Sequence, residues 1–377
     1  IDFALTREDI PVKDVSYFGM LDESIGYIRL TRFSKNSHLE VEKAIKSLLG
    51  NDLNSIVLDL RDNPGGLLNS AVKILDLFID KKELLVWTDG KARQSNKKYF
   101  SKNDPIVPND IQLAVLINGG SASASEIVAG VMQDLDRGVV IGRKSFGKGL
   151  VQTVYNIDRN KALKVTTAKY YIPSGRLIQK SGYLPDELLA DTVSSDSLFE
   201  TVGGREVKSG DGITPDYIIK PEKRNPILLA CLRKGLFFSY VQKNKHLYES
   251  FAEVNNDPIL LEQLEDYIMT HEEDLNIKLD GENAYLETKE TLMNLDSNDI
   301  SISGAIELLD SYFEEKAITQ FDRESEDIKD WVLMEFAKQF DGEKGRMKIS
   351  QRIDEDITKA IDILDDPFTY REVFLHY

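Results

Sequence analysis

Residues 55–66 read Ser-Ile-Val-Leu-Asp-Leu-Arg-Asp-Asn-Pro-Gly-Gly, and this stretch carries the pattern that decides the fold. Its first six residues form a short apolar run, which is typical of a strand buried on both faces. The glycines Gly65 and Gly66 then predict a tight turn, because glycine adopts backbone conformations that other residues avoid. An expected helix follows and runs through residues 77–78. This strand–turn–helix unit predicts the α/β fold class.

The same unit recurs along the first half of the chain. Residues 113–117 predict a second buried strand, Gly119 and Gly120 interrupt it, and residues 125–132 have a helical pattern. Further expected strands cover residues 24–30, 139–142 and 217–219, and residues 38–49 predict a helix that ends at Gly50. Residues 162–171 are β-branched and aromatic, and we expect them to pair in the same sheet. Repeated units of this kind predict a layered α/β domain.

Charge and glycine content change near Pro221. Residues 1–221 carry 29 Lys and Arg against 29 Asp and Glu, whereas residues 222–377 carry 18 against 35, so the entire net charge of −17 lies in the second part. Only five of the 24 glycines lie beyond Gly212, and amphipathic helical spacing begins at Pro226. We therefore expect a core over residues 1–221, with an exposed inserted loop at 182–212, followed by an acidic α-helical domain over residues 222–377.

Composition excludes several classes of protein. The acidic total disfavours a general nucleic-acid binder, which needs clustered cations. No apolar run approaches the roughly 20 residues that span a bilayer. One cysteine, Cys231, cannot form an intramolecular disulfide, and the four histidines have no metal-ligand spacing, so we expect no zinc site. The first residue is Ile1, and we expect any signal peptide or lipid anchor to precede it.

Three loops at the ends of expected strands could carry chemistry. In residues 59–66 the paired glycines let backbone N–H groups approach a ligand. Residues 118–127 place small residues and serines at a strand–helix junction, but Ser123 and Glu126 also fit a capping box, and Ser121 or Ser125 could cap the helix instead. Residues 145–152 hold a lysine between two glycines. Such a lysine is either a solvated charge or, in an apolar pocket, a neutral amine that accepts a serine proton.

Taken together, these loops resemble those of the C-terminal processing proteases, also called tail-specific proteases. Five motifs carry the resemblance, and they occur in the order of the family: Asp59 to Gly66, Gly120 to Ile127, Gln133-Asp134 with Arg137, Phe146 to Gly149 with Gln152, and Tyr170 to Arg176. The resemblance runs from about Phe3 to Asp216. It implies a crotonase-like (ClpP/crotonase-type) layered protease core.

The resemblance also implies the site residues. The middle serine of the Ser-Ala-Ser-Ala-Ser run, Ser123, would be the nucleophile of a Ser-Lys dyad, and Lys148 would be its general base. Gln152 would hold the Lys148 amine in line. The Ala124 N–H, together with an N–H from Gly65 or Gly66, would stabilise the oxyanion. The implied reaction is peptide-bond hydrolysis without a cofactor.

The family usually carries a peptide-binding PDZ domain before the segment that starts here, and we expect this chain to lack it. The resemblance implies protein or peptide substrates, notably C-terminal tails, and is compatible with a homo-oligomer. It also implies an extracytoplasmic protein, in the bacterial periplasm or envelope.

Two other readings compete with the protease. A non-catalytic member of the same fold would bind a ligand or protein, although such a protein need not keep both Ser123 and Lys148. An acyl-CoA enzyme of the crotonase type would use a similar oxyanion site, but it has no need for the serine–lysine pair.

Overall fold

The computed structural model describes residues 7–8, 12–180, 197–220, 226–271, 281–295 and 300–375. Its contacts divide the chain into two compact units. The core unit comprises Ile1–Lys220 together with Asp354–Tyr377, and the helical unit comprises Pro221–Ile353. The predicted second domain over residues 222–377 therefore differs from the structure, because its last helices pack with the core.

A six-stranded sheet organises the core unit, in the order β1-β2-β3-β6-β7-β12. The strands β2 to β12 are parallel, and β1 is antiparallel to β2. Their bounds are Val15–Met20 (β1), Ile25–Leu30 (β2), Ser55–Asp59 (β3), Gln112–Ile117 (β6), Val139–Gly142 (β7) and Tyr217–Ile218 (β12). The five predicted strands of this sheet, β2, β3, β6, β7 and β12, are confirmed, as are the predicted helices that follow β2, β3 and β6. The predicted mixed α/β core followed by helices is likewise what the structure shows.

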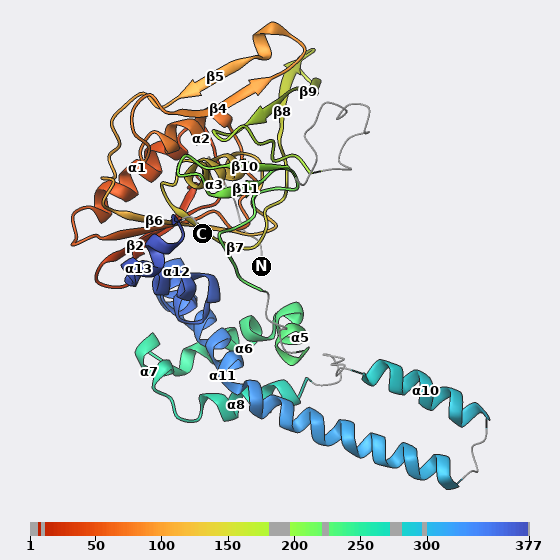
Figure 1. Ribbon diagram of the computed structural model, residues 1–377. Coiled ribbons are helices and arrows are strands. Elements are labelled where there is room, and N and C mark those ends of the chain that lie inside the picture. The colour runs from red at the N-terminus through yellow and green to blue at the C-terminus, as the bar shows by residue number, and fades with distance from the viewer. Residues whose placement is uncertain are drawn as a thin grey trace. The chain divides into compact units, whose positions relative to one another are not determined.

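Helices cover both faces of this sheet. Alternate strand residues such as Ile56, Leu58 and Val115 belong to one large core cluster. On that side lie α1 (Ser37–Leu48), α2 (Leu68–Leu75) and α3 (Ala124–Asp134). The helix α12 (Glu355–Asp365) contacts β6 and β7, and Figure 1 shows it with α13 (Pro367–Glu372) on the other side. Both faces are thus buried, which explains the unbroken apolar pattern of β3 and β6.

Residues 162–171 do form a strand, β9 (Ala162–Tyr171), but they do not join this sheet. They pair in a separate antiparallel sheet of order β5-β4-β9-β8, so the predicted pairing was wrong. The short distance along the chain from β8 to β9 favours a hairpin, and the hairpin partner defines the sheet. The other strands are Leu84–Asp89 (β4), Lys97–Phe100 (β5) and Leu150–Asn156 (β8).

The predicted exposed loop at 182–212 falls partly outside the described residues. From residue 197 the chain forms a hairpin of β10 (Leu198–Glu200) and β11 (Glu206–Lys208). Thr201, Val207 and Ser209 are buried, and Arg205 pairs with Asp136 at 2.8 Å. This part is therefore anchored to the core unit, contrary to the expectation of an exposed excursion.

The helical unit has its own apolar core, built from residues such as Leu236, Phe237 and Phe336. The predicted helix from Pro226 is broken at Gly235, which has a left-handed backbone (φ 65°) and separates α5 from α6. The helices are Pro226–Lys234 (α5), Leu236–Asn244 (α6), Phe251–Asn255 (α7), Leu260–Met269 (α8), Glu282–Leu295 (α10) and Ile300–Ile353 (α11), the last interrupted at Gly342.

Candidate active site

The three predicted loops meet at one edge of the six-stranded sheet. They follow β3, β6 and β7, which are parallel neighbours, so their carboxyl ends lie on the same side. Backbone hydrogen bonds join them: Ala122 N–H donates to the Asn63 carbonyl at 3.0 Å, and Phe146 N–H donates to the Ser121 carbonyl at 3.0 Å. Three loops that are far apart in the sequence are therefore joined side by side at this end of the sheet.

The three serines of the run at 121–125 have different surroundings. Ser121 and Ser125 are buried, and their hydroxyls donate at 2.8 Å to the carbonyls of Leu60 and Asn63. Both hydroxyls thus hold the second loop against the first. Ser123 is partly exposed and stands directly before α3. Of these three serines, Ser123 alone combines solvent access with the junction of strand and helix that a nucleophile needs.

The backbone of Ser123 is strained. Its φ and ψ angles are 57° and −110°, in a region that non-glycine residues rarely occupy. Such a conformation costs about 1–3 kcal/mol and persists only where the surroundings enforce it. A sharp, strained turn from strand to helix is a known way to expose a serine hydroxyl. The strain is therefore consistent with a functional serine.

The Glu126 carboxylate binds both the serine loop and the lysine loop. Its carboxylate accepts from Ser123 N–H and Lys148 N–H at 2.8 Å each, both on Oε2, and from Gly147 N–H at 2.6 Å and the Ser145 hydroxyl at 2.5 Å on Oε1. Burial raises the pKa of Glu126, and the four donors oppose that rise. The Ser123 N–H contact is one half of the capping box that the sequence predicted. The sequence did not indicate the other half of its role, because the third loop lies about 20 residues away.

Tyr170 also joins Ser123 to Lys148. Its hydroxyl donates to the Lys148 carbonyl and lies 3.2 Å from the Ser123 carbonyl. Burial and the Glu126 charge raise the pKa of Tyr170 well above its usual value, so the hydroxyl stays protonated as a donor. Sequence analysis had singled out Tyr170 only as part of a motif, without a role.

The two glycines of the first loop behave differently. Gly65 has a φ of 90°, and a Cβ atom there would lie 2.4 Å from the Ala122 carbonyl oxygen and 2.8 Å from the Ala124 nitrogen. The Gly65 N–H donates to Asn63 Oδ1 at 2.9 Å, so it already has a partner. Within the described residues, the N–H groups of Gly66 and Ala124 have no such partner. Gly65 therefore provides close approach to the serine turn, and of the two glycine N–H groups it is that of Gly66 that has no partner among the described residues.

Lys148 and Gln152 follow on the third loop and on β8. Lys148 is partly exposed, and neither side chain forms a hydrogen bond within the part of the chain that the structure describes. A β-bulge between Val151 and Gln152 shifts the pairing of β8 with β9. Bulges often redirect a side chain beside an active site. The backbone of Lys148 is thus tied to that of Ser123, whereas its amine has no hydrogen-bond partner among the described residues.

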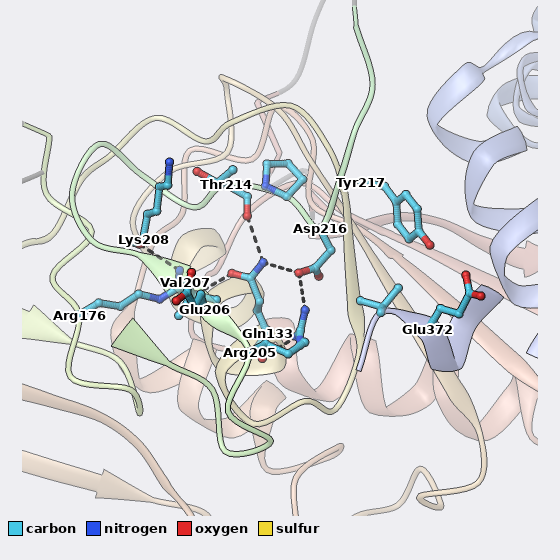
Figure 2. Close-up of a pocket in the computed structure, with 12 residues that line it drawn as sticks. Gln133, Arg176, Arg205, Glu206, Val207, Lys208, Thr214, Asp216, Tyr217 and Glu372 are labelled. Atoms are coloured by element: carbon cyan, nitrogen blue, oxygen red, sulfur yellow. Dashed lines mark hydrogen bonds and ion pairs between the residues drawn. The ribbon is translucent and has the colours of Figure 1, made fainter. Parts of the chain in front are cut away.

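The remaining motif residues gather at the other end of α3, about 16 Å along the helix from Ser123. Figure 2 shows that pocket: Gln133 donates to the Thr214 carbonyl and to Asp216, and Arg176 donates to Gln133 at 2.6 Å. Arg176 also pairs with the buried Asp134 at 2.7 Å. These contacts fix the hairpin and the sheet edge, so the motifs Gln133-Asp134 and Tyr170 to Arg176 serve the fold here as well as the site.

The described residues include no group of three or more His, Cys, Asp or Glu side chains placed to hold a metal ion. None of the helices in the described ranges is both long enough and apolar enough to cross a membrane.

Sequence comparison places this chain beside known proteases. The sequence profile of peptidase family S41 matches residues 24–189. A carboxy-terminal-processing protease of Bartonella bacilliformis is 43% identical over 190 residues, which cover 49% of this chain and 43% of that protein. A carboxyl-terminal-processing protease of Synechocystis sp. is 38% identical over 199 residues, covering 52% of this chain and 45% of that protein.

Among solved structures, a photosystem II D1 C-terminal processing protease is similar at 27% identity with a TM-score of 0.43, covering 58% of this chain and 51% of that one. The chain thus spans less than half the length of the two curated relatives named above. Residues 24–189 contain all three loops of the site. This segment is a peptidase family S41 domain, of the C-terminal processing protease family.

Proposed function

We propose that this protein is a serine endopeptidase of the C-terminal processing type, which hydrolyses peptide bonds in proteins through Ser123 and Lys148. The observation that carries the proposal is the shared Glu126 carboxylate, which binds the backbone N–H groups of both residues at 2.8 Å. A serine and a lysine from two separate loops are thereby kept at one place. A fold that used these loops only as turns would not require this connection.

The proposed reaction begins when the Lys148 amine takes the proton of the Ser123 hydroxyl as the serine oxygen attacks a peptide carbonyl. The N–H groups of Ala124 and Gly66 then bind the developing oxyanion, a contribution of about 3–4 kcal/mol for each donor. Lys148 returns its proton to the leaving amine, and the peptide C–N bond breaks. Water, deprotonated by Lys148, hydrolyses the acyl-enzyme.

Lys148 can act as a base only as a neutral amine, yet it is partly exposed. A bound substrate would cover the amine and exclude water from it. Gln152, which lies four residues further along on β8, would accept a hydrogen bond from the amine and orient it. Full competence would therefore depend on an occupied site.

The names of the relatives support a proposal for the substrate class and the location. Two of them are named as carboxyl-terminal-processing proteases, and a third, from Arabidopsis thaliana, is named as a chloroplastic carboxyl-terminal-processing peptidase at 37% identity over 199 residues. We infer that the natural substrates are proteins cut near their C-termini. By the same resemblance, the protein acts outside the cytoplasm, in the periplasm or envelope of a bacterium.

Ser123→Ala and Lys148→Ala test the proposal, with cleavage of an unfolded protein with an apolar C-terminus and labelling by a serine-directed acylating probe as the two readouts. Both variants are expected to lose cleavage, and Ser123→Ala is expected to lose labelling. Lys144→Ala is the matched control, because Lys144 lies in the same loop and makes only an exposed ion pair with Asp211. Undiminished cleavage by Ser123→Ala would refute the proposal, because the peptide bond would then break without Ser123. Absence of both cleavage and labelling in the wild type would favour a binding protein of the same fold.

A further inference from the structure

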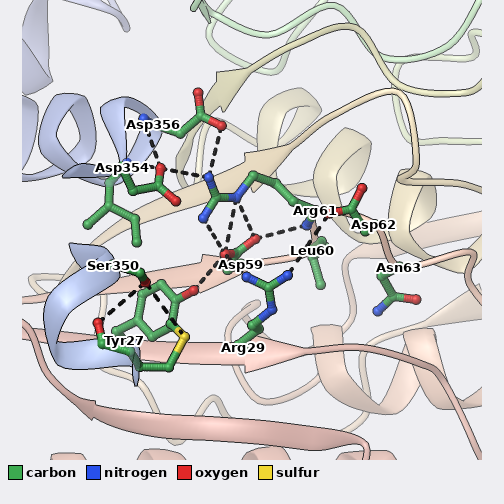
Figure 3. A network of polar contacts seen from close by, with 12 residues as sticks. Tyr27, Arg29, Asp59, Leu60, Arg61, Asp62, Asn63, Ser350, Asp354 and Asp356 are labelled. Carbon is green, nitrogen blue, oxygen red and sulfur yellow. Dashed lines mark hydrogen bonds and ion pairs between the residues drawn. The ribbon is translucent and has the colours of Figure 1, made fainter. Parts of the chain in front are cut away.

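A network of buried charges lies beside the site, at the end of β3 (Figure 3). The Arg61 guanidinium pairs with Asp59 at 2.7 Å, with Asp354 at 2.7 Å and with Asp356 at 3.0 Å. The side chain of Arg61 is 9% exposed and that of Asp59 is fully buried. Arg61 belongs to the glycine loop that packs against Ser123, whereas Asp354 and Asp356 come from the start of α12, almost 300 residues later.

Asp356 connects a second loop to the same network. Its Oδ2 atom lies 3.0 Å from an Arg61 Nη1 and 3.3 Å from Arg143 Nη1. Arg143 directly follows β7 and begins the loop that carries Ser145, Gly147 and Lys148. One buried carboxylate therefore holds both loops that flank Ser123, the glycine loop on one side and the lysine loop on the other.

The start of α12 holds the carboxylates of Asp354 and Asp356 in place. Asp354 is the N-cap of α12, and its Oδ1 accepts from the N–H groups of Asp356 and Ile357 at 3.1 and 3.2 Å. Tyr370 on α13 anchors the same segment, since its hydroxyl accepts from Leu113 N–H of β6 at 3.1 Å. The two arginines are thus held against a rigid element rather than a loop.

The stability of the core unit does not by itself explain why these buried positions carry charged side chains. Apolar residues of similar volume usually stabilise a protein interior as well as a buried ion pair does. The reason is that removing the charges from water costs about as much free energy as their attraction contributes. What a charge network adds is fixed geometry, since each carboxylate oxygen admits few directions of approach. In this unit the fixed geometry falls on the two loops that flank Ser123, one of which carries Lys148.

We propose that Asp354 and Asp356 are positioning residues for the serine–lysine site: through Arg61 and Arg143 they set the spacing of the loops on either side of Ser123. The inference rests on the proposed peptidase function and deepens it. It also makes the geometry of the site depend on the segment that directly follows the helical unit, because Asp354 is joined to Ile353, the last residue of that unit.

The first test is Asp356→Asn in the full chain, which keeps shape and removes charge. We expect kcat for peptide cleavage and the rate of Ser123 acylation by a small serine-directed probe both to fall about 10- to 100-fold, because displacing a reacting group slightly has an effect of that size. KM should change less than kcat. Asp362→Asn is the matched control: it is the same substitution on an exposed position of the same helix, and activity should be unchanged.

The unfolding midpoints of Asp356→Asn and Asp362→Asn distinguish a loss of positioning from a loss of fold. The rates of cleavage and acylation are measured under conditions well below the lower of the two midpoints. Acylation and cleavage at wild-type rates in a folded Asp356→Asn variant would overturn the inference. If Ser123→Ala abolishes cleavage in the same assays, the proposed function stands even when this inference fails. If Ser123→Ala cleaves normally, the proposed function fails first.

The second test is a double-mutant cycle between Asp356→Asn and Arg143→Met. If Asp356 acts through Arg143, the double variant should lose no more activity than the more damaged single variant. Effects that multiply would mean independent action and would overturn the assignment of Arg143. Asp354→Asn, which keeps an N-cap side chain, should repeat the loss of kcat with a smaller loss of stability than Asp354→Ala.

Discussion

The backbone nitrogens of Ser123 and Lys148 donate to the same atom, Oε2 of Glu126, each at 2.8 Å. The two nitrogens therefore lie within twice that distance of each other, although 24 residues separate Ser123 from Lys148 in the sequence. Glu126 is itself fully buried, so neither contact competes with solvent. The relative placement of the proposed nucleophile and base is thus controlled by a residue that takes no part in the proposed bond-making.

Glu126→Gln should damage the site more than its small change in shape suggests. An amide in place of the carboxylate puts an NH₂ group opposite two donors, either the N–H groups of Ser123 and Lys148 or the Gly147 N–H and the Ser145 hydroxyl. Buried donors without partners cost about 1–3 kcal/mol, so we expect a loss of that order in the free energy of unfolding. Chemical denaturation measures the loss, and probe labelling of Ser123 should fall as well. Normal labelling would show that the Glu126 contacts do not set the site.

Tyr170→Phe removes the hydroxyl that donates to the Lys148 carbonyl, at constant ring volume. We expect a loss of about 1 kcal/mol in stability, the typical contribution of one hydrogen bond. Labelling of Ser123 should slow, because the Lys148 backbone loses a restraint. Tyr155→Phe is the matched control, since Tyr155 is 51% exposed at the end of β8. Equal effects of both changes would argue against a role for Tyr170 in the site.

Gly65→Ala tests the close approach of the first loop to the serine turn. The new Cβ would lie 2.4 Å from the Ala122 carbonyl oxygen, and a φ of 90° is strained for alanine. We expect a loss of stability above about 1 kcal/mol and loss of labelling, because the loop must move away from Ala124. Gly119→Ala is the control, since nothing lies within 4 Å of a Cβ at that position. A fully active Gly65→Ala variant would contradict the packing described here.

Stability should depend on pH through Asp59. Burial tends to raise the pKa of Asp59, but the charges of Arg61 and Arg29 and the Arg61 and Tyr27 hydrogen bonds hold it below its usual value. A depressed folded pKa stabilises the protein above the unfolded pKa of about 3.9 and ceases to do so as the pH falls through the folded value. The difference in melting temperature between wild type and Asp59→Asn should therefore be constant near pH 7 and narrow below about pH 4. A difference that widens on acidification would contradict this sign.

The last helices should be necessary for the core unit. Ile363 is fully buried on α12, the helix that contacts β6 and β7, and Ile363→Ala should cost about 2–5 kcal/mol. Leu375→Ala, at a position that is 57% exposed, should cost less than 1 kcal/mol. Thermal unfolding of the core unit measures both losses of stability. A negligible effect of Ile363→Ala would mean that α12 is not part of the sheet's cover.

Local pattern was enough for the strands and helices around the candidate site and for the loops that carry its residues. The apolar run at 55–60, the glycine pair and the serine run appear in the sequence, and β3, β6, β7 and α3 form where the pattern predicts them. Local pattern was not enough for β9, whose residues favour a strand without specifying its sheet. Local pattern also did not distinguish Ser123 from Ser121 and Ser125 as the exposed serine. Only burial in the folded protein decides which hydroxyls donate to a neighbouring carbonyl.

What the sequence determined by itself was the alternation of strand and helix and the loops at the strand ends, since each depends on residues close together in the chain. Tertiary structure decided which partners those loops meet. Glu126 reaches the lysine loop, Tyr170 reaches both carbonyls, and Asp354 and Asp356 return from the far end of the chain to Arg61 and Arg143. A continuous apolar strand requires cover on both faces, but its own residues cannot specify which distant helix supplies it.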